Sequence, residues 1–500
     1  MGGVLIKAIY SNKHFIHALF LSLVITLSVL TSACSVNPAT GDRSFTGLMS
    51  PEDEQRIGAE EHPKLVKAFG GLYKDEKLQS YVSSVGELVH ATSEMHNNPF
   101  TFVILDSPVV NAYALPGGYI HITRGLLALA NDEAELAGVL AHEIGHVTAR
   151  HSAQRHTRGL IASLSTTILG AVLGSRPIAE LSNLVGNAYI QGYSRDQEFE
   201  ADDLGVRYLA RAGYDPLAMS TFLESMRLED DLRKKIINKS SISERPSIFA
   251  SHPRTSDRVL RSANEASVRN VSARERERTI FLKKLDGLIW GDSPDQGYIN
   301  GQKFNHPILQ IHFLAPPKFN LRNHENSISG GHKNGAFMNF DGDKLPQNNT
   351  NLQNYLENEW LSNIRLSDLE KIYINGMEAV TATGLLTIGG GWSNARFVVI
   401  RWSKDYVYRF LFVNPVGDPP LMDQQFKESA FSFRRLTSIE AELLRPLRIK
   451  IVEVKEGETM TTLSKKMAMK NNKFEWFKVL NGLSSTSQVE VGQLIKLVSY

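Results

Sequence analysis

Hydrophobic and polar positions divide the 500-residue chain into stretches of different pattern. From Pro51 to about Ala266, apolar residues recur mostly at spacings of three and four, which predicts helices. Strand-like alternation interrupts them between Phe100 and Thr123, where Pro116-Gly117-Gly118 supplies a turn. This part is therefore predicted to be mainly helical, with a small β-sheet.

The ends of three helices can be placed from capping residues. Ser50 is expected to cap a helix that begins with Pro51 and several acidic residues, and Asn131 or Asp132 is expected to start a long helix. A further helix is expected to run from about Ser194 to Ala212 and to stop at glycine.

Two segments between these helices have other patterns. Residues 159–174 are apolar but rich in Ser, Thr and Gly and short for a membrane span, so a buried helix or a lid over a site is expected. Residues 226–247 carry many charges and are expected to form a polar connection.

After about Ser272, strand-like runs alternate with Gly-, Asn- and Pro-rich loops, which indicates an α+β domain. Short helices are expected at residues 348–360 and 366–371. His306 and His312 lie in isolated strand-like contexts, so we expect structural roles for them. The last stretch reads strand, helix, helix, strand, and its "EGET", "LNGL" and "VGQLIKL" segments resemble a LysM module.

The predicted fold is therefore multidomain. A mainly α domain with a small β-sheet precedes an α+β domain and a small βααβ, LysM-like domain. The predicted boundaries are a signal peptide at 1–33, a tether at 34–50, the mainly α domain at 51–272, the α+β accessory domain at 273–440 and the LysM-like domain at 449–498.

The N-terminus predicts export. Lys7 and Lys13 precede an apolar run that ends in "TSAC", and no acidic residue occurs before Asp42. Cys34 is the only cysteine, and its context resembles the lipobox of bacterial lipoproteins, although Thr31 stands where leucine is usual. We therefore expect an acylated Cys34 and, because Ser35 follows it, an outer-membrane lipoprotein facing the periplasm. Anchoring in the inner membrane is the alternative.

Composition and charge limit the classes of partner that the protein can bind. A hydrophobic content of 42% and a charged content of 22% are typical of globular protein. The formal net charge is only +2 and no basic block stands out, so no nucleic-acid partner is expected.

The candidate chemistry lies in "HEIGH", residues 142–146. Residues four apart share a helix face, so His142 and His146 can bind one zinc ion, while Glu143 can take a proton from water held there. Gly145 weakens a helix, and its presence indicates that another segment passes close to it. Burying two histidines and an acid without a metal would be costly.

A third ligand must come from elsewhere. His151 is five residues past His146 and is expected to point away. In "SRDQEFEADDLG", Glu198 and Asp202 share a helix face. Glu198 can bind the metal while Asp202 accepts a hydrogen bond from a ligand histidine. Glu200 and Asp203 are expected to be solvated.

Together, "HEIGH", "NAYALPGG", "SRDQEFEADDLG" and "SHPRTSDR" resemble the motifs of the BepA, HtpX and CAAX-prenyl-protease group of gluzincin metallopeptidases. The resemblance implies that residues 51–272 form a zincin-type zinc metallopeptidase domain. It implies one Zn²⁺ per chain held by His142, His146 and Glu198, with Glu143 as catalytic base. It also places His252 and Arg258 beside the metal. They are expected to stabilise the oxyanion, and His252 can instead fill the open zinc position and keep the enzyme latent.

The resemblance implies a polypeptide substrate. The backbone of Asn111 and Ala112 is expected to offer a strand edge to an extended, unfolded segment. The predicted function is zinc-dependent cleavage of unfolded or misassembled envelope proteins, with residues 449–498 binding peptidoglycan. Two alternatives remain: a latent, peptidoglycan-binding envelope lipoprotein, and a peptidase that cuts peptidoglycan cross-links. No 34-residue repeat occurs.

Overall fold

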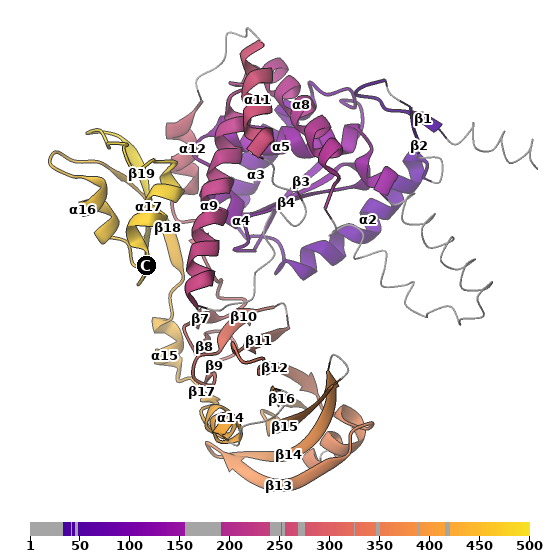
Figure 1. Cartoon of the computed structure of the whole chain (residues 1–500), viewed down its shortest axis with the longest axis vertical. Coiled ribbons are helices and arrows are strands. Elements are labelled where there is room, and N and C mark those ends of the chain that lie inside the picture. The colour runs from indigo at the N-terminus through magenta and orange to yellow at the C-terminus, as the bar shows by residue number, and fades with distance from the viewer. Residues whose placement is uncertain are drawn as a thin grey trace, which may run out of the picture.

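The computed structural model shows a mainly helical region, a β-rich region that projects from it, and a small C-terminal unit against its flank (Figure 1). The residues that the structure describes are 34–41, 43–45, 49–155, 192–240, 252, 256–268, 276–324, 326–346, 351–388, 391–415 and 421–500. The expected signal peptide and the apolar run at 159–174 therefore lie outside the described residues. Among the described residues, no helix has the length and apolar composition to span a membrane.

The helices of the first region begin and end largely where the sequence predicts. Ser50 forms a reciprocal capping box with Asp53, Asp132 caps the long helix, and Gly213 ends a later helix at a φ of 81°. The helices of this region are α2 (Pro51–Ala68), α3 (Glu76–His90), α4 (Arg124–Leu129), α5 (Glu133–Thr148), α8 (Arg195–Ala212), α9 (Ala218–Ser240), α11 (Ser256–Val268) and α12 (Arg278–Leu285).

The polar connection expected at 226–247 is wrong over its first part, because α9 continues to Ser240. Phe222, Met226 and Leu232 are buried along one side of this helix. Arg227 pairs with acids three and four residues away on the solvent side. The dense charges of that outer face obscured the apolar stripe.

The small sheet has the order β3-β5-β4, with β3 (Thr101–Leu105) parallel and β4 (Ala112–Leu115) antiparallel to β5 (Tyr119–Thr123). Gly117 and Gly118 of the connecting turn, η1 (Pro116–Gly118), have φ angles of 76° and 86°, which explains the two glycines. The strand β4 therefore lies at an edge of the sheet, next to α5.

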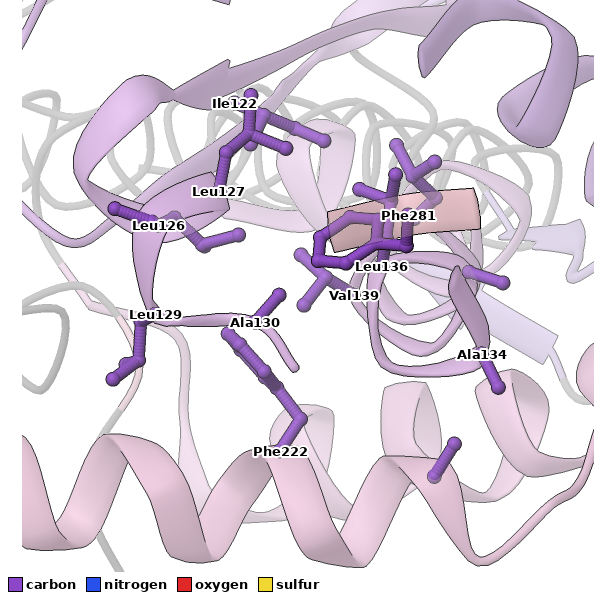
Figure 2. Packing of buried hydrophobic residues seen from close by; sticks show 14 of the residues in the cluster. Ile122, Leu126, Leu127, Leu129, Ala130, Ala134, Leu136, Val139, Phe222 and Phe281 are labelled. Atoms are coloured by element: carbon purple, nitrogen blue, oxygen red, sulfur yellow. The ribbon is translucent and has the colours of Figure 1, made fainter. Parts of the chain in front are cut away.

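Helix α5 runs through the centre of this region, and all its residues from Ala134 to Thr148 are buried. Figure 2 shows Leu136 and Val139 of this helix among side chains from α4, α9 and α12, including Phe222 and Phe281. The same hydrophobic cluster extends into the C-terminal unit, where it includes Phe477 and Ile495.

The β-rich region has two antiparallel sheets, with strand orders β10-β11-β12-β16-β15-β14-β13 and β17-β9-β8-β7. A separate core fills it, in which Phe313, Phe340 and Phe410 are buried. Its strands are β7 (Tyr298–Asn300), β8 (Lys303–His306), β9 (Ile311–Leu314), β10 (Asn320–Asn323), β11 (Ser327–Gly331), β12 (Phe337–Lys344), β13 (Leu366–Ile374), β14 (Met377–Ile388), β15 (Gly391–Arg401), β16 (Tyr406–Val413) and β17 (Arg434–Arg435). Its helical segments are α13 (Leu352–Asn354), η2 (Tyr355–Trp360), α14 (Leu421–Phe431) and α15 (Ser438–Leu443).

One short helix in this region was predicted correctly and the other was not. Residues 352–360 are helical, but 366–371 belong to β13. A bulge between Ser367 and Glu370 interrupts the alternation of the strand, and Leu366 and Leu369 both pack against the same hydrophobic cluster. Their spacing of three therefore imitated a helix.

The C-terminal unit has the predicted order of strand, helix, helix and strand. It comprises β18 (Leu447–Glu453), α16 (Met460–Lys465), α17 (Lys473–Asn481) and β19 (Leu494–Ser499). A further strand, β6 (Ile289–Trp290), pairs with β18, so that Trp290 lies opposite Leu447. The β-rich region thus leaves and re-enters the rest of the molecule at two neighbouring residues.

Candidate metal centre

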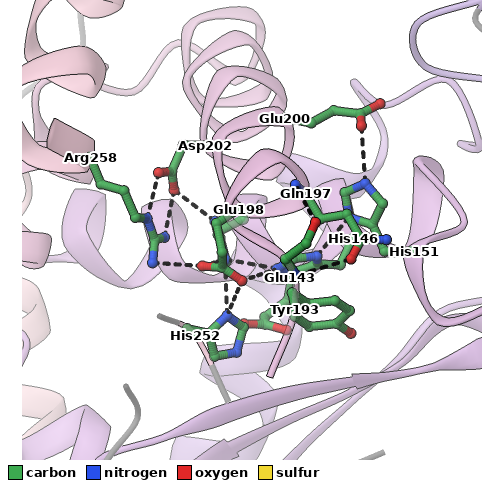
Figure 3. A network of polar contacts seen from close by, with 12 residues as sticks. Glu143, His146, His151, Tyr193, Gln197, Glu198, Glu200, Asp202, His252 and Arg258 are labelled. Atoms are coloured by element: carbon green, nitrogen blue, oxygen red, sulfur yellow. Dashed lines mark hydrogen bonds and ion pairs between the residues drawn. The ribbon is translucent and has the colours of Figure 1, made fainter. Parts of the chain in front are cut away.

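Helices α5 and α8 bring His142, His146 and Glu198 together, and Figure 3 shows His146 and Glu198 of this group. The Nε2 atoms of His142 and His146 lie 3.0 Å apart. One carboxylate oxygen of Glu198 lies 3.4 Å from His146 Nε2, and the other lies 3.7 Å from His142 Nε2. A Cβ on Gly145 would lie 3.0 Å from the carbonyl oxygen of Ala201, so the close approach inferred from this glycine is confirmed.

His252 completes the cluster. Its Nδ1 lies 3.0 Å from Glu198 Oε1 and 3.4 Å from His142 Nε2. One ligand atom from each of His142, His146, Glu198 and His252 lies within 4.8 Å of all the others, and all four residues are buried. The structure therefore places His252 among the candidate ligands themselves.

These residues fit a zinc ion. Three imidazoles and one carboxylate are typical zinc donors. Glu198 Oε2 forms an ion pair with Arg258 but accepts no hydrogen bond. Burial lowers the pKa of His146, which favours the neutral form that binds metal. Burial acts to raise the pKa of Glu198, but His252 and Arg258 outweigh it and hold that pKa well below its usual range. The cluster thus combines neutral nitrogen and anionic oxygen donors that a cation would satisfy.

Glu143 lies beside the cluster and is buried. Its Oε1 lies 3.7 Å from His252 Nε2, and its Oε2 has no hydrogen-bond partner. Burial raises the pKa of this carboxyl group. A carboxylate with a raised pKa can both accept and return a proton near neutral pH.

Asp202 and Arg258 form a buried pair behind the cluster. Arg258 donates from Nε and Nη2 to the two oxygens of Asp202, at 2.7 Å each, and its Nη1 lies 2.6 Å from Glu198 Oε2. Asp202 Oδ1 in turn lies 2.9 Å from His142 Nδ1. Asp202 therefore contacts His142, and the guanidinium of Arg258 is directed at two carboxylates.

The expectation for His151 is wrong, and the one for Glu200 holds only in part, because its side chain is 30% exposed but bonded to His151. His151 is buried, its Nδ1 lies 2.8 Å from His146 Nδ1, and its Nε2 lies 3.1 Å from a carboxylate oxygen of Glu200. Helix α5 ends at Thr148 and Arg150 has a φ of 55°, so the chain turns and brings His151 back to the metal-binding face. Projecting the helix beyond its end gave the wrong direction.

Two further features lie near the centre. Tyr193 stacks on the His146 ring with centroids 3.7 Å apart, and nothing in its sequence context marked it. Asn111 and Ala112, the expected substrate contacts, are buried at the start of the edge strand β4. Asn111 donates a side-chain hydrogen bond to Tyr113 Oη and accepts one from the Ala112 N–H.

Comparison with known proteins agrees with this geometry. Residues 76–265 match the model of peptidase family M48. The chain is 32% identical over 223 residues to a putative beta-barrel assembly-enhancing protease of Vibrio cholerae, covering 43% of this chain and 44% of that protein. It is 29% identical over 288 residues to the beta-barrel assembly-enhancing protease of Escherichia coli, covering 53% and 56%.

A eukaryotic protein matches as well. The human mitochondrial metalloendopeptidase OMA1 is 27% identical over 239 residues, which cover 45% of this chain and 44% of that protein. The chain thus spans about half the length of the curated relatives that it matches.

Proposed function

We propose that the chain is a zinc metalloendopeptidase whose metal is held by His142, His146 and Glu198, because residues 76–265 match the model of peptidase family M48. The observation that carries this proposal is the meeting of the three side chains in one buried cluster, beside the Glu143 carboxylate. Zinc, when bound, supplies the Lewis acidity that lowers the pKa of water to about 7 and polarises a peptide carbonyl.

Three further residues have catalytic or supporting roles in the proposed reaction. Glu143 accepts a proton from the attacking water and returns it to the leaving amine. Asp202 orients His142 through Nδ1, and Arg258 holds the carboxylates of Asp202 and Glu198 in place. Because its three guanidinium nitrogens face these carboxylates, we assign Arg258 to this support and not to oxyanion binding.

His252 has a different role in the arrangement described here. Its Nδ1 approaches both Glu198 and His142, so His252 would help His142, His146 and Glu198 to hold the metal in a latent, resting enzyme. His252 would stabilise the oxyanion only in a state in which its imidazole no longer contacts Glu198.

The edge position of β4 and the names of the relatives support a polypeptide substrate. We infer that an extended segment binds along the outer edge of β4, near Asn111 and Ala112, where a folded protein would not fit. We therefore propose unfolded or misassembled envelope proteins as substrates. Export to the periplasm, acylation of Cys34, attachment to the outer membrane and peptidoglycan binding by residues 449–498 belong to the same proposal.

The decisive experiment compares the full chain with its Glu143→Gln variant, both purified in mild detergent. Glu143→Gln removes the base but no metal ligand, so zinc content should stay at one ion per chain while casein cleavage falls about 10²–10⁴-fold. Asp203→Asn, a change at an exposed ion pair on α8, is the matched control and should leave cleavage unchanged. Equal cleavage by Glu143→Gln and the wild type would exclude this mechanism.

A further inference from the structure

A chain of hydrogen bonds leads from the candidate ligand His146 to the segment that follows Cys34. His146 Nδ1 lies 2.8 Å from His151 Nδ1, and His151 Nε2 lies 3.1 Å from Glu200 Oε2. The other oxygen of Glu200 accepts a hydrogen bond of 2.8 Å from the side-chain amide of Asn37. Two residues, His151 and Glu200, thus connect the candidate ligand His146 to Asn37.

The direction of each bond follows from the chemistry of the groups. The Nε2 of His146 faces the cluster, which leaves Nδ1–H to donate to His151 Nδ1. His151 must then carry its proton on Nε2, where it donates to Glu200. A carboxylate can only accept, so Glu200 receives one hydrogen bond from His151 and one from Asn37. With these proton positions, each hydrogen bond between His146 and Asn37 has one donor and one acceptor.

The orientation of the Asn37 amide is fixed independently. Its Oδ1 accepts the backbone N–H of Ala39 at 2.8 Å, so Nδ2 must face Glu200. Asn37 and Ala39 are buried, with 2% and 7% of their surfaces exposed, and Arg207 of α8 donates to the Ala39 carbonyl at 2.9 Å. The segment 37–41 is therefore held against α8 and also bonded to Glu200.

The two ligand histidines are supported differently. His142 is held by Asp202, a residue of the same helix as Glu198. His146 is held through a route that ends outside the matched family region of residues 76–265. Outer partners of this kind fix the tautomer and orientation of a metal-binding imidazole.

We propose that His151, Glu200 and Asn37 are positioning residues for His146, so that the segment directly after Cys34 forms part of the metal site. The proposal rests on the proposed zinc-peptidase function. It implies that the residues next to the expected membrane anchor help to set how firmly the enzyme holds its metal.

The test exploits the two-sided role of Glu200. In Glu200→Gln, a single amide oxygen remains, so the side chain can accept from His151 or from Asn37 but not from both. Adding Asn37→Asp restores both hydrogen bonds of residue 200. The amide nitrogen of the glutamine can then donate to the carboxylate at position 37, while its oxygen accepts from His151. The pair of substitutions exchanges acid and amide and keeps the overall size and charge of the site.

Zinc affinity is measured by chelator competition in the full chain carrying Glu143→Gln, which prevents self-cleavage. We expect Glu200→Gln to weaken zinc binding about 10–100-fold and the double variant to recover most of that loss. The visible spectrum of the cobalt-loaded protein should change in Glu200→Gln and return in the double variant. Asp203→Asn on the same helix is the control and should match the parent in both readouts.

The outcomes separate this proposal from the proposed function. If the parent chain binds no zinc at this site, the proposed function fails. If the parent binds zinc, and Glu200→Gln matches Asp203→Asn in both affinity and cobalt spectrum, the positioning role is overturned while the peptidase assignment stands. Loss in Glu200→Gln without recovery in the double variant also overturns it, because Asn37 would then not be the partner that matters.

Discussion

The β-rich region and the C-terminal unit follow each other in the sequence but join the helical region, the proposed peptidase, in different ways. The β-rich region has its own core, built around buried phenylalanines such as Phe313 and Phe410. The C-terminal unit shares the hydrophobic cluster of the peptidase, to which it contributes Phe477, Ile495 and Val498. The C-terminal unit is therefore more closely integrated with the helical region than the β-rich region is.

Two polar features sharpen this contrast. Lys496 of β19 is fully buried, and its ammonium group donates to the carbonyls of Ala128, Leu129 and Ala130 at 2.7–3.2 Å. These carbonyls lie at the end of α4, where a positive charge is favourable. The β-rich region instead reaches the peptidase through contacts such as the exposed Lys74–Asp295 pair.

The position of the junction explains the difference. Trp290 and Leu447 are paired neighbours in one sheet, so residues 291–446 form an insertion between two strands that would otherwise make a hairpin. An insertion can carry its own core, whereas β18 and β19 complete a sheet that packs on α12 and α17.

The largest predicted effect compares two deletions. Removing residues 447–500 takes away several fully buried apolar side chains, each contributing about 1.5–3 kcal/mol, which together approach the entire stability of a domain. We expect this chain to lose cooperative unfolding and zinc binding. Replacing residues 292–445 with a short Asn-Gly-containing turn should leave both intact, as measured by calorimetry and zinc content.

The reverse result would show that the shared core has been assigned to the wrong region. A chain that binds zinc without residues 447–500, but not without 292–445, would require the β-rich region to hold the peptidase together.

A pair of core substitutions should separate the two regions within the intact chain. Phe281→Ala and Phe410→Ala each empty a fully buried site and should cost about 3–5 kcal/mol. Zinc added in excess should raise the melting temperature of the transition that Phe281→Ala lowers, because zinc binds only to the folded peptidase. It should not shift the transition that Phe410→Ala lowers. Calorimetry with and without zinc would refute the division if both variants affected one common transition.

Lys496→Met should have a smaller effect, of about 2–3 kcal/mol, because three carbonyls at the end of α4 lose their donor while the cost of burying a charge is removed. Denaturant unfolding of the chain that lacks residues 292–445 would measure it. Lys450→Met, at an exposed position of β18, is the control and should leave the unfolding midpoint unchanged.

The smallest effect is predicted for Lys74→Ala, which breaks the exposed pair with Asp295 at the junction. Neither melting transition should move measurably, because surface ion pairs contribute little. A clear shift of the peptidase transition would mean that the β-rich region is coupled to it through this contact.

Much of the metal centre could be predicted because it depends on helix periodicity. The spacing of His142, Glu143 and His146 fixes which side chains share a face, and the same argument pairs Glu198 with Asp202. His151 and Glu200 could not be placed in this way. Their contact depends on the turn at Arg150, a local conformation that side-chain spacing does not encode.

The fold was predictable to a similar extent. Capping residues located the ends of α2, α5 and α8, and the strand–helix–helix–strand order of the last unit was correct. The pairing of Trp290 with Leu447 joins residues more than 150 positions apart and leaves no local pattern. Lys496 gave no signal either, because a lysine in a strand is ordinarily found at the surface.

The order of these segments in the sequence determines which region can fold first. The insertion between Trp290 and Leu447 precedes β18 and β19 in the chain, so the phenylalanine-rich sheet can assemble while the helical region still lacks these two strands. The candidate metal centre should therefore form only after β18 and β19 have packed. A chain that stops before β18 should fail to bind its metal.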